Sequence, residues 1–450
     1  MLRRMILGML TAAVLLTGHA GRAEENAPLY AVQLPDGAAL VSADGTEAAQ
    51  PGAYGILYEL DGFPEEAKRF AAGKEEGMAL LDEKGSLLTD FSYQMLEYAD
   101  GVILCSENGR QGVMDTDGRL LIEPLYTGLV RLEKGRYLAL KTDPYDDSPD
   151  MLYLVDGSGG EKSAGIRIMN GLYNAAEGLI PAVSAENGLY GYLNAQGQWA
   201  VKPSFEWAGA FHGGRAEASG PSGAGLIDKS GNWLIRPEYD HLSCSGGDVA
   251  VGGRSGVISI IDAESGQTVA AYKGNDVYGY PTVGDAAVVM ADGYTAVVDR
   301  TGAEILRLEG CHMLSQWSDM TDTAIAAMGD SDSVDVCLYR LDGTMLAGPY
   351  RDIMPLGPLD GEMYYTFTMF DTEMVEYSDY GLTFWDEVPG TRRCGVLSPE
   401  GEELCRIETE YISCLGEGRM VYQQEGVTFM ADFSGKILWQ HETEGMEEGQ

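Results

Sequence analysis

The 450-residue sequence predicts an all-β fold made of about ten to eleven repeated units. Turns in which Asp, Asn or Ser precedes a glycine recur at intervals of roughly 37 residues, a spacing typical of repeat proteins. Helical periodicity is almost absent after the first 23 residues, and short strand-like segments replace it. The turn glycines are Gly45, Gly85, Gly118, Gly159, Gly197, Gly231, Gly266, Gly302, Gly343, Gly401 and Gly435.

The segment before each turn predicts a strand that enters a tight hairpin. Examples are GVMDTDG at 112, GYLNAQG at 191, GLIDKSG at 225, AVVDRTG at 296 and GVLSPEG at 395. Glycine adopts the positive φ that such turns require, and the preceding Asp or Asn can accept hydrogen bonds from the turn backbone. We therefore interpret these acidic residues as hairpin tips and not as catalytic acids.

The segment after the turn predicts the returning strand. RLLIEPLY, QWAVKPSF and NWLIRPEY place apolar residues at alternate positions before Pro124, Pro203 and Pro237. Proline cannot donate a ladder hydrogen bond, so we expect each proline to end its strand or to lie on an edge.

A third recurring segment is rich in small and β-branched residues, as in DGVILCS at 100, EGLIPAVS at 177 and GDAAVVM at 284. Each unit then has three to four short strands in an antiparallel meander. A single meander cannot bury both of its faces, so neighbouring meanders must stack on each other. This predicts a β-propeller-like architecture, either one large ring or two smaller rings, with an open curved array as the remaining alternative. The first and last segments would together complete one blade.

These segments resemble the WG-repeat family. The stretch GLYGYLNAQGQWAVKPSFEWAGAFHGGRAEAS, residues 188–219, carries the resemblance, which is clearest over residues 77–256 and 395–440. The family's tryptophan is replaced, because the residue before the strand glycine is Gln111, Tyr190, Ala224 or Cys394. The resemblance implies a β-propeller-like repeat and brings no shared catalytic residues.

The first 23 residues predict a secretory signal peptide. Arg3 and Arg4 precede an apolar run from Met5 to Leu16, and small residues follow, with cleavage expected after Ala20 or Ala23. A retained membrane anchor is the alternative, but the run is shorter than the roughly 20 residues that span a bilayer. We therefore divide the chain into a signal peptide (1–23), a repeat array (24–442) and an acidic tail (443–450). The mature protein is expected to be soluble and secreted, or to reside in the cell envelope.

The composition excludes one class of partner and bears on the cysteines. With 70 acidic and 30 basic residues, the chain has a formal net charge of −40 and should repel nucleic acid. The seven cysteines are odd in number and contain no C-x-x-C pair, so buried free thiols are expected. A disulfide among Cys394, Cys405 and Cys414 is the open alternative.

The longest interval, between Gly343 and Gly401, contains an insertion at about 355–393 that is rich in aromatic and acidic residues. Aromatic side chains beside carboxylates can anchor a protein partner or stack on sugar rings, and insertions in repeats usually lie on the binding face. Alternatively, the aromatic residues form the core of an elongated unit. The predicted ligand-binding residues are Tyr364, Tyr365, Phe367, Tyr377, Tyr380, Phe384 and Trp385.

No catalytic, cofactor or metal motif stands out. The acidic loops at 143–150 and 329–335 lack the spaced ligands of a calcium loop, and neither H-E-x-x-H nor G-x-S-x-G occurs. We predict a non-catalytic scaffold, without cofactor or metal, that binds a protein or glycan partner at the bacterial cell surface or outside the cell. The alternatives are a carbohydrate-active enzyme with paired carboxylates and a purely structural envelope protein.

Overall fold

The computed structural model describes residues 28–63, 68–133, 135–142, 149–173, 175–274, 277–282, 285–291, 293–315, 322–330, 333–377 and 382–442. The predicted signal peptide and acidic tail lie outside these residues. Within them the protein is all-β, as predicted, and no helix is long and apolar enough to cross a membrane.

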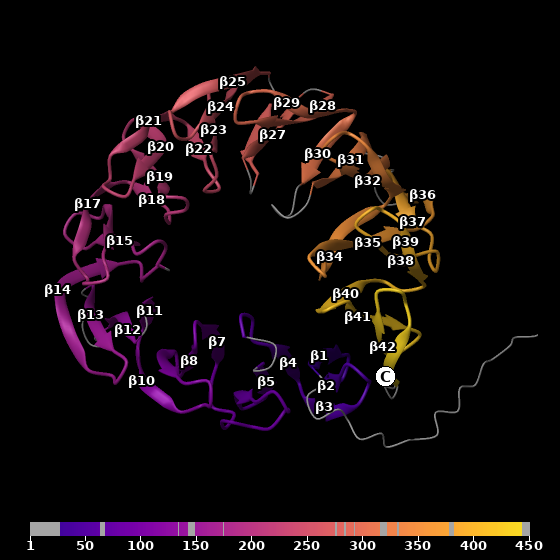
Figure 1. Ribbon diagram of the computed structural model, residues 1–450, viewed down its shortest axis with the longest axis horizontal. Coiled ribbons are helices and arrows are strands. Elements are labelled where there is room, and N and C mark those ends of the chain that lie inside the picture. Colours follow the sequence, from indigo (N-terminus) through magenta and orange to yellow (C-terminus); the bar gives the residue numbers. More distant parts are fainter. Residues whose placement is uncertain are drawn as a thin grey trace, which may run out of the picture.

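The sheets form one ring (Figure 1), so of the three predicted arrangements the single large ring is the one observed. Along the described residues the chain forms eleven successive modules, each built around one of the eleven turn glycines. A complete module has four antiparallel strands that follow one another from the centre outward, with the first at the inner rim of the ring and the fourth at the outer rim. Each module forms its own sheet except the fourth and fifth, which share seven strands because β14 also pairs with β15.

Modules 1 to 3 contain β1 (Leu29–Leu34), β2 (Gly37–Ser42) and β3 (Glu47–Tyr54); β4 (Ile56–Glu59), β5 (Phe70–Lys74) and β6 (Gly77–Leu81); and β7 (Met95–Ala99), β8 (Val102–Glu107), β9 (Arg110–Met114) and β10 (Leu120–Tyr126). Modules 4 and 5 contain β11 (Gly128–Glu133), β12 (Arg136–Lys141), β13 (Asp150–Asp156) and β14 (Glu161–Met169); and β15 (Ile180–Ser184), β16 (Tyr190–Leu193) and β17 (Trp199–Phe205). Module 6 contains β18 (Trp207–Ala208), β19 (Arg215–Gly220), β20 (Gly223–Asp228) and β21 (Trp233–Tyr239).

Modules 7 and 8 contain β22 (His241–Ser243), β23 (Val249–Arg254), β24 (Val257–Asp262) and β25 (Gln267–Lys273); and β26 (Tyr278–Pro281), β27 (Ala286–Ala291), β28 (Tyr294–Asp299) and β29 (Glu304–Glu309). Module 9 contains β30 (Cys311–Ser315), β31 (Thr323–Asp330), β32 (Ser333–Arg340) and β33 (Met345–Tyr350). Module 10 contains β34 (Asp352–Leu359), β35 (Glu362–Met369), β38 (Arg393–Leu397) and β39 (Glu403–Ile407), with β36 (Thr372–Tyr377) and β37 (Leu382–Glu387) inserted as a separate hairpin. Module 11 contains β40 (Ile412–Gly416), β41 (Arg419–Gln424), β42 (Val427–Asp432) and β43 (Ile437–Glu442).

The predicted turns are confirmed. All eleven turn glycines have positive φ, from 67° at Gly266 to 90° at Gly343. The acid before the glycine accepts backbone hydrogen bonds, as Asp299 does from the N–H groups of Thr301 and Ala303 at 2.8 and 3.0 Å. These aspartates are therefore structural parts of the turns.

The turn carboxylates make stability depend on pH. The Thr301 hydroxyl and the turn N–H groups lower the pKa of Asp299 below its ordinary value of 3.8. This stabilisation is therefore present above pH 3.8 and is lost as the pH falls through the pKa of the folded state. Asp299→Asn keeps an acceptor but does not titrate, so its thermal midpoint should lie below that of wild type near neutral pH. The gap should close on acidification, whereas a gap that stays constant with pH would contradict this role.

The repeat glycine on the third strand and the proline on the fourth meet at a bulge. A Cβ at Gly191 would lie 2.6 Å from the carbonyl oxygen of Val201. The pairing of β16 with β17 shifts between Val201 and Phe205, around Pro203. Pro124, Pro203 and Pro237 lie inside β10, β17 and β21 and do not end these strands. The prediction that each proline ends its strand or lies on an edge is confirmed by the second possibility, because β10, β17 and β21 are the outermost strands of their sheets.

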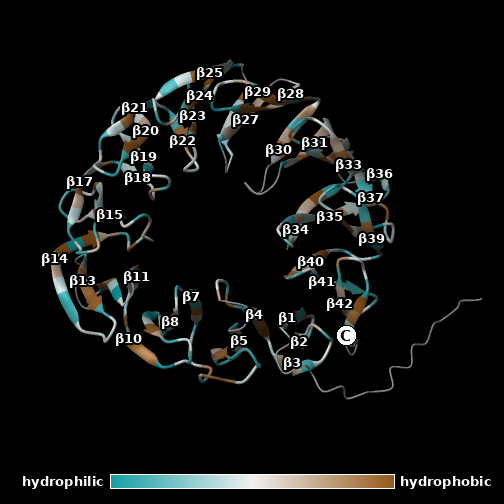
Figure 2. Ribbon diagram, in the orientation of Figure 1, coloured by the Kyte–Doolittle hydropathy of each residue, from teal (hydrophilic) through white to brown (hydrophobic). Residues whose placement is uncertain are grey.

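The core lies between neighbouring modules. One cluster joins Val251 and Ile260 of module 7 to Val289 and Ala296 of module 8, and comparable clusters recur around the ring. Apolar and polar segments accordingly alternate along the whole ring (Figure 2). Each module thus buries its faces against its two neighbours, as the stacking argument requires.

The ring closes by side-chain packing between modules 1 and 11. Tyr30, Val32 and Val41 share a buried cluster with Met430 and Trp439. The Trp439 indole N–H donates to Glu47 at 3.0 Å, and the Tyr30 hydroxyl donates to Glu417 at 2.9 Å. The prediction that the first and last segments share a blade is wrong, because β1–β3 and β40–β43 form separate sheets.

All seven cysteines are free thiols, so the alternative of a disulfide among Cys394, Cys405 and Cys414 is not observed. Cys105, Cys311, Cys337 and Cys394 are buried, whereas Cys244, Cys405 and Cys414 are partly exposed. Burial raises the pKa of Cys105 to about 12. A thiol of this kind packs as a small apolar side chain.

Candidate functional site

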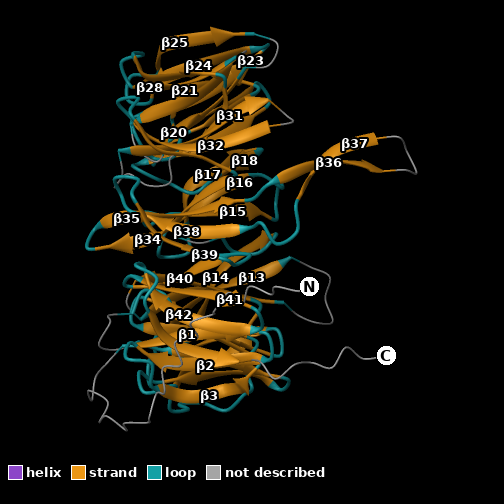
Figure 3. Ribbon diagram, turned by 90° about the vertical axis from the view of Figure 1, so that its right-hand side faces the viewer, coloured by secondary structure: helices purple, strands orange, loops and turns teal. Residues whose placement is uncertain are grey.

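The predicted insertion forms a hairpin that leaves the ring. Strands β36 and β37 lie between β35 and β38 in the chain, pair only with each other and project from one face of the ring, roughly along the ring axis (Figure 3). The base of the hairpin is anchored on Phe370, with the guanidinium groups of Arg392 and Arg351 at 4.8 and 5.7 Å from the ring centroid. Arg392 also donates from Nε to Glu387 at 3.1 Å. Cation–π and charge-assisted contacts thus fix the base of the hairpin to the module.

The seven predicted binding residues do not form one surface. Tyr365 and Phe367 are buried in the core of module 10, at 3% and 0% exposure, so the packing alternative is correct for them. Their position follows from the alternation along β35, which places both on the face that packs against module 9. Tyr364 is partly buried against Phe433, with ring centroids 5.2 Å apart.

Three of the remaining four belong to the hairpin. Tyr377 lies on β36, and Phe384 and Trp385 lie on β37, in register with Val375 and Met374. Their side chains and the whole of Tyr380 lie outside what the structure describes. The binding prediction therefore remains a prediction for these four residues.

A second set of aromatic residues lines the inner rim. Most of the exposed large apolar side chains in the described residues lie either on fourth strands or on first strands. Those on or directly before the first strands are mainly aromatic or sulfur-containing, and Trp207 and Tyr278 are 45% and 60% exposed. We call this set the inner belt: Ile56, Tyr58, Trp207, Tyr278, Tyr280, Met313, Met354 and Tyr411.

Strand alternation explains why these side chains face solvent. On β4 the buried Leu57 lies between the exposed Ile56 and Tyr58. On β26 the exposed Tyr278 and Tyr280 are two residues apart, so they share a face. Because first strands form the inner rim (Figure 1), the exposed first-strand positions of several modules all belong to that rim.

Part of the inner belt is held in place by contacts between modules. The Tyr280 hydroxyl donates to the carbonyl of Leu314 on the next module, and burial of that hydroxyl raises the tyrosine pKa to about 12. The ring of Tyr280 is therefore positioned before any ligand arrives, which lowers the entropy cost of binding. Within module 6, the indole ring of Trp207 lies close over Gly209.

Two exposed histidines, His241 and His312, lie on β22 and β30, the first strands of different modules. Among the described residues, no three His, Cys, Asp or Glu side chains converge where they could hold a metal ion. Most of the acidic loop at 143–150 lies outside these residues.

The sequence patterns that predicted the modules did not reveal the inner belt. The three recurring segments correspond to the second, third and fourth strands, whereas the first strands share no common phrase. The available signal was local: an aromatic pair at alternate positions, as in VYGYP at 277–281, or Trp207 after the aromatic that closes the fourth strand.

Residues 190–219 and 225–248 match the family model of the WG-containing repeat. These two segments are therefore similar to WG repeats. The first matched WG repeat covers β16, β17, β18 and β19, and so joins the outer half of module 5 to the inner half of module 6. The sequence repeat is thus offset by half a module from the sheet that it builds.

No curated protein matches this chain. Among solved structures, a eukaryotic initiation factor is similar over 93% of this chain and 96% of its own, with 10% identity and a TM-score of 0.45. BamB from Moraxella catarrhalis covers 67% of this chain and 91% of its own, with 13% identity and a TM-score of 0.28. Hsv2p from Kluyveromyces lactis covers 66% and 97%, with 10% identity and a TM-score of 0.29.

Proposed function

We propose that the protein is an exported, non-catalytic scaffold that binds a protein partner through the inner belt, at the cell envelope or outside the cell. The observation that carries the proposal is the concentration of exposed aromatic and methionine side chains on the first strands. Exposed apolar patches of this kind are typical of interaction sites. The export step rests on the signal-like residues 1–23.

The composition of the inner belt favours a protein over a glycan. Trp and Tyr dominate protein-binding hot spots, and Met is enriched at protein interfaces. Met313, Met354 and Ile56 offer no flat ring on which a sugar could stack. The net charge of −40 further favours a partner whose contact surface is neutral or basic.

The proposal is tested by removing the two most exposed rings of the inner belt. The double variant Trp207→Ala/Tyr278→Ala and the wild type are immobilised and exposed to envelope and secreted proteins of the source cells. A partner retained by wild type should bind the double variant at least about tenfold more weakly, since each hot-spot ring contributes on the order of 2 kcal/mol. Leu234→Ala, on the outer strand β21 and 38% exposed, is the matched control and should bind as wild type does.

Two outcomes would contradict the proposal. Equal loss of binding in the Leu234→Ala control would show that the effect is not specific to the inner belt. If the chain bound no protein partner but bound a glycan array through Trp207 and Tyr278, the ligand would be a glycan and not a protein. Release of reducing sugar from that glycan would show that the chain is an enzyme.

A further inference from the structure

Module 1 differs from the others at its inner edge. In complete modules the turn glycine lies between the third and fourth strands, as Gly118 lies between β9 and β10. In module 1 the corresponding Gly45 lies between β2 and β3, so β1 and β2 occupy the second and third positions. Among the described residues, β1 and β15 are the second-position strands that lack a first strand of their own module, and β15 pairs with β14 at that edge whereas β1 has no strand there.

The free edge of β1 presents backbone groups. The register places Tyr30 opposite Val41 and Ala31 opposite Leu40, and the Ala43 N–H donates to the Pro28 carbonyl at 3.1 Å. Since hydrogen-bonded pairs alternate along an antiparallel ladder, the N–H and C=O groups of Leu29, Ala31 and Gln33 point away from β2. An edge of this kind is a template for another strand.

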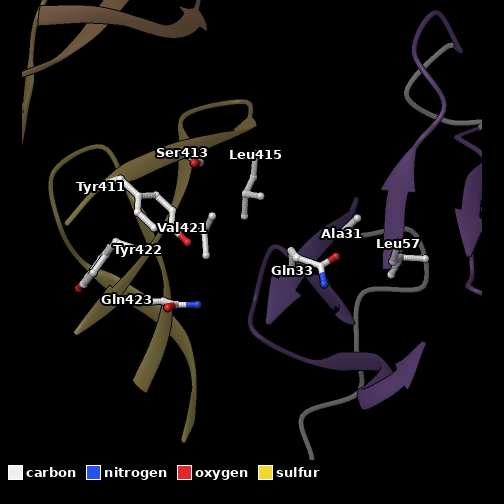
Figure 4. Close-up of a pocket in the computed structure, with 9 residues that line it drawn as sticks. All are labelled: Ala31, Gln33, Leu57, Tyr411, Ser413, Leu415, Val421, Tyr422 and Gln423. Atoms are coloured by element: carbon white, nitrogen blue, oxygen red, sulfur yellow. The ribbon is translucent and has the colours of Figure 1, made fainter. Parts of the chain in front are cut away.

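A pocket of about 200 Å³ lies along this edge (Figure 4). Ala31 and Gln33 of β1 form one wall together with Leu57 of β4, and Leu415 of β40 with Val421 and Gln423 of β41 form the opposite wall. Since β4 and β40 are the first strands of the two flanking modules, the pocket lies where module 1 would have its own first strand. None of the described residues that line it is charged.

We propose that β1 accepts an extended segment of a partner protein as an additional antiparallel strand at the inner rim. Main-chain hydrogen bonds to Leu29, Ala31 and Gln33 would supply affinity, and the apolar walls would select apolar side chains at alternate positions. Tyr411, an inner-belt residue, also lines the pocket. The inference therefore rests on the proposed function and specifies how the same partner engages the ring.

A partner segment fits this edge better than the chain's own C-terminal sequence. Residues 443–450, TEGMEEGQ, contain one apolar residue, two glycines and three glutamates. Glycine and acidic residues are depleted in strands, and a protein with a net charge of −40 attracts a basic segment and repels an acidic one. A basic peptide with apolar residues at alternate positions is therefore the appropriate probe.

The test uses the peptide TGLVRLK, which is the sequence of β11 and its preceding residue with Glu133→Lys. Fluorescence polarisation measures its binding to the full chain, and hydrogen exchange follows the backbone amides of β1. The amides of Ala31 and Gln33 should become protected on binding, while those of Tyr30 and Val32 are already protected by pairing with β2. Methylating the peptide nitrogens at one set of alternate positions should weaken binding about tenfold or more, and methylating the other set should not.

Ala31→Pro provides the matching change in the protein. It removes one edge donor but leaves the β2 ladder intact, so the thermal midpoint should stay close to wild type and the peptide affinity should fall about tenfold. Trp207→Ala should bind the peptide as wild type does. The Trp207→Ala variant therefore tests the two proposals separately. Partner binding through the inner belt can be lost while peptide binding at the β1 edge is retained, and the reverse also holds.

Three results would overturn the inference. They are no binding of the peptide by the full chain, binding without protection of Ala31 and Gln33, and equal weakening by both methylation patterns. Tighter binding after deletion of residues 443–450 would also overturn it, because the edge would then serve the chain's own C-terminal segment.

Discussion

Replacing Trp439 by alanine is expected to lower the free energy of unfolding by about 3–5 kcal/mol, the range for a buried tryptophan. Trp439 is 7% exposed, lies in the cluster that joins modules 1 and 11, and donates to Glu47 across the same junction. Because no strand crosses this junction, the lost packing has no backbone ladder to compensate for it. Urea-induced unfolding measures the effect, and hydrogen exchange should show that amides of β1, β2 and β43 open first.

Ile437→Ala is the matched control for Trp439→Ala. Ile437 lies on the same strand, β43, but is 49% exposed, so its loss should change stability by no more than about 0.5 kcal/mol. If both substitutions had the same effect, or if exchange rose evenly around the ring, side-chain packing at this junction would not be what closes it.

Replacing Phe367 by alanine is expected to destabilise the protein by a similar amount, about 3–5 kcal/mol. The ring of Phe367 is fully buried, stacks on Tyr350 with centroids 4.4 Å apart, and fills the space that Gly395 leaves by having no Cβ. The cavity left by truncation adds to the lost transfer free energy. The thermal midpoint should fall clearly, and partner affinity measured well below that midpoint should stay unchanged.

Met354→Ala separates packing from binding within the same module. Met354 is 49% exposed on β34 and belongs to the inner belt, so its loss should leave the midpoint nearly unchanged and weaken partner binding. If a folded Phe367→Ala variant bound the partner more weakly, Phe367 would contribute to the binding surface, as the sequence predicted.

Local sequence determined what could be predicted. The turns in which Asp, Asn or Ser precedes glycine are visible because the polar residue and the glycine that close a hairpin lie close together in the chain, and all eleven turn glycines have positive φ as expected. The placement of Pro203 within β17 was missed, because it depends on a bulge over Gly191, and that bulge is a contact between two strands. Only its edge position followed from the missing N–H group.

The candidate site depended on which strand each aromatic residue occupies. Phe367 and Tyr278 are both aromatic residues in alternating segments, yet one lies on a second strand and is buried, and the other lies on a first strand and is exposed. Periodicity gives the two faces of a strand but not its distance from the centre of the ring. The closing contact of Tyr30 with Glu417 is likewise invisible in the sequence, since 387 positions separate the two residues.

The half-module offset of the WG repeat has a consequence for how such chains grow. A tandem duplication of one repeat inserts an outer pair of strands followed by an inner pair, so each new half sheet is completed by the chain on either side. After duplication or loss of a single copy, every sheet therefore still has both of its halves. The ring can gain or lose one module at a time during evolution.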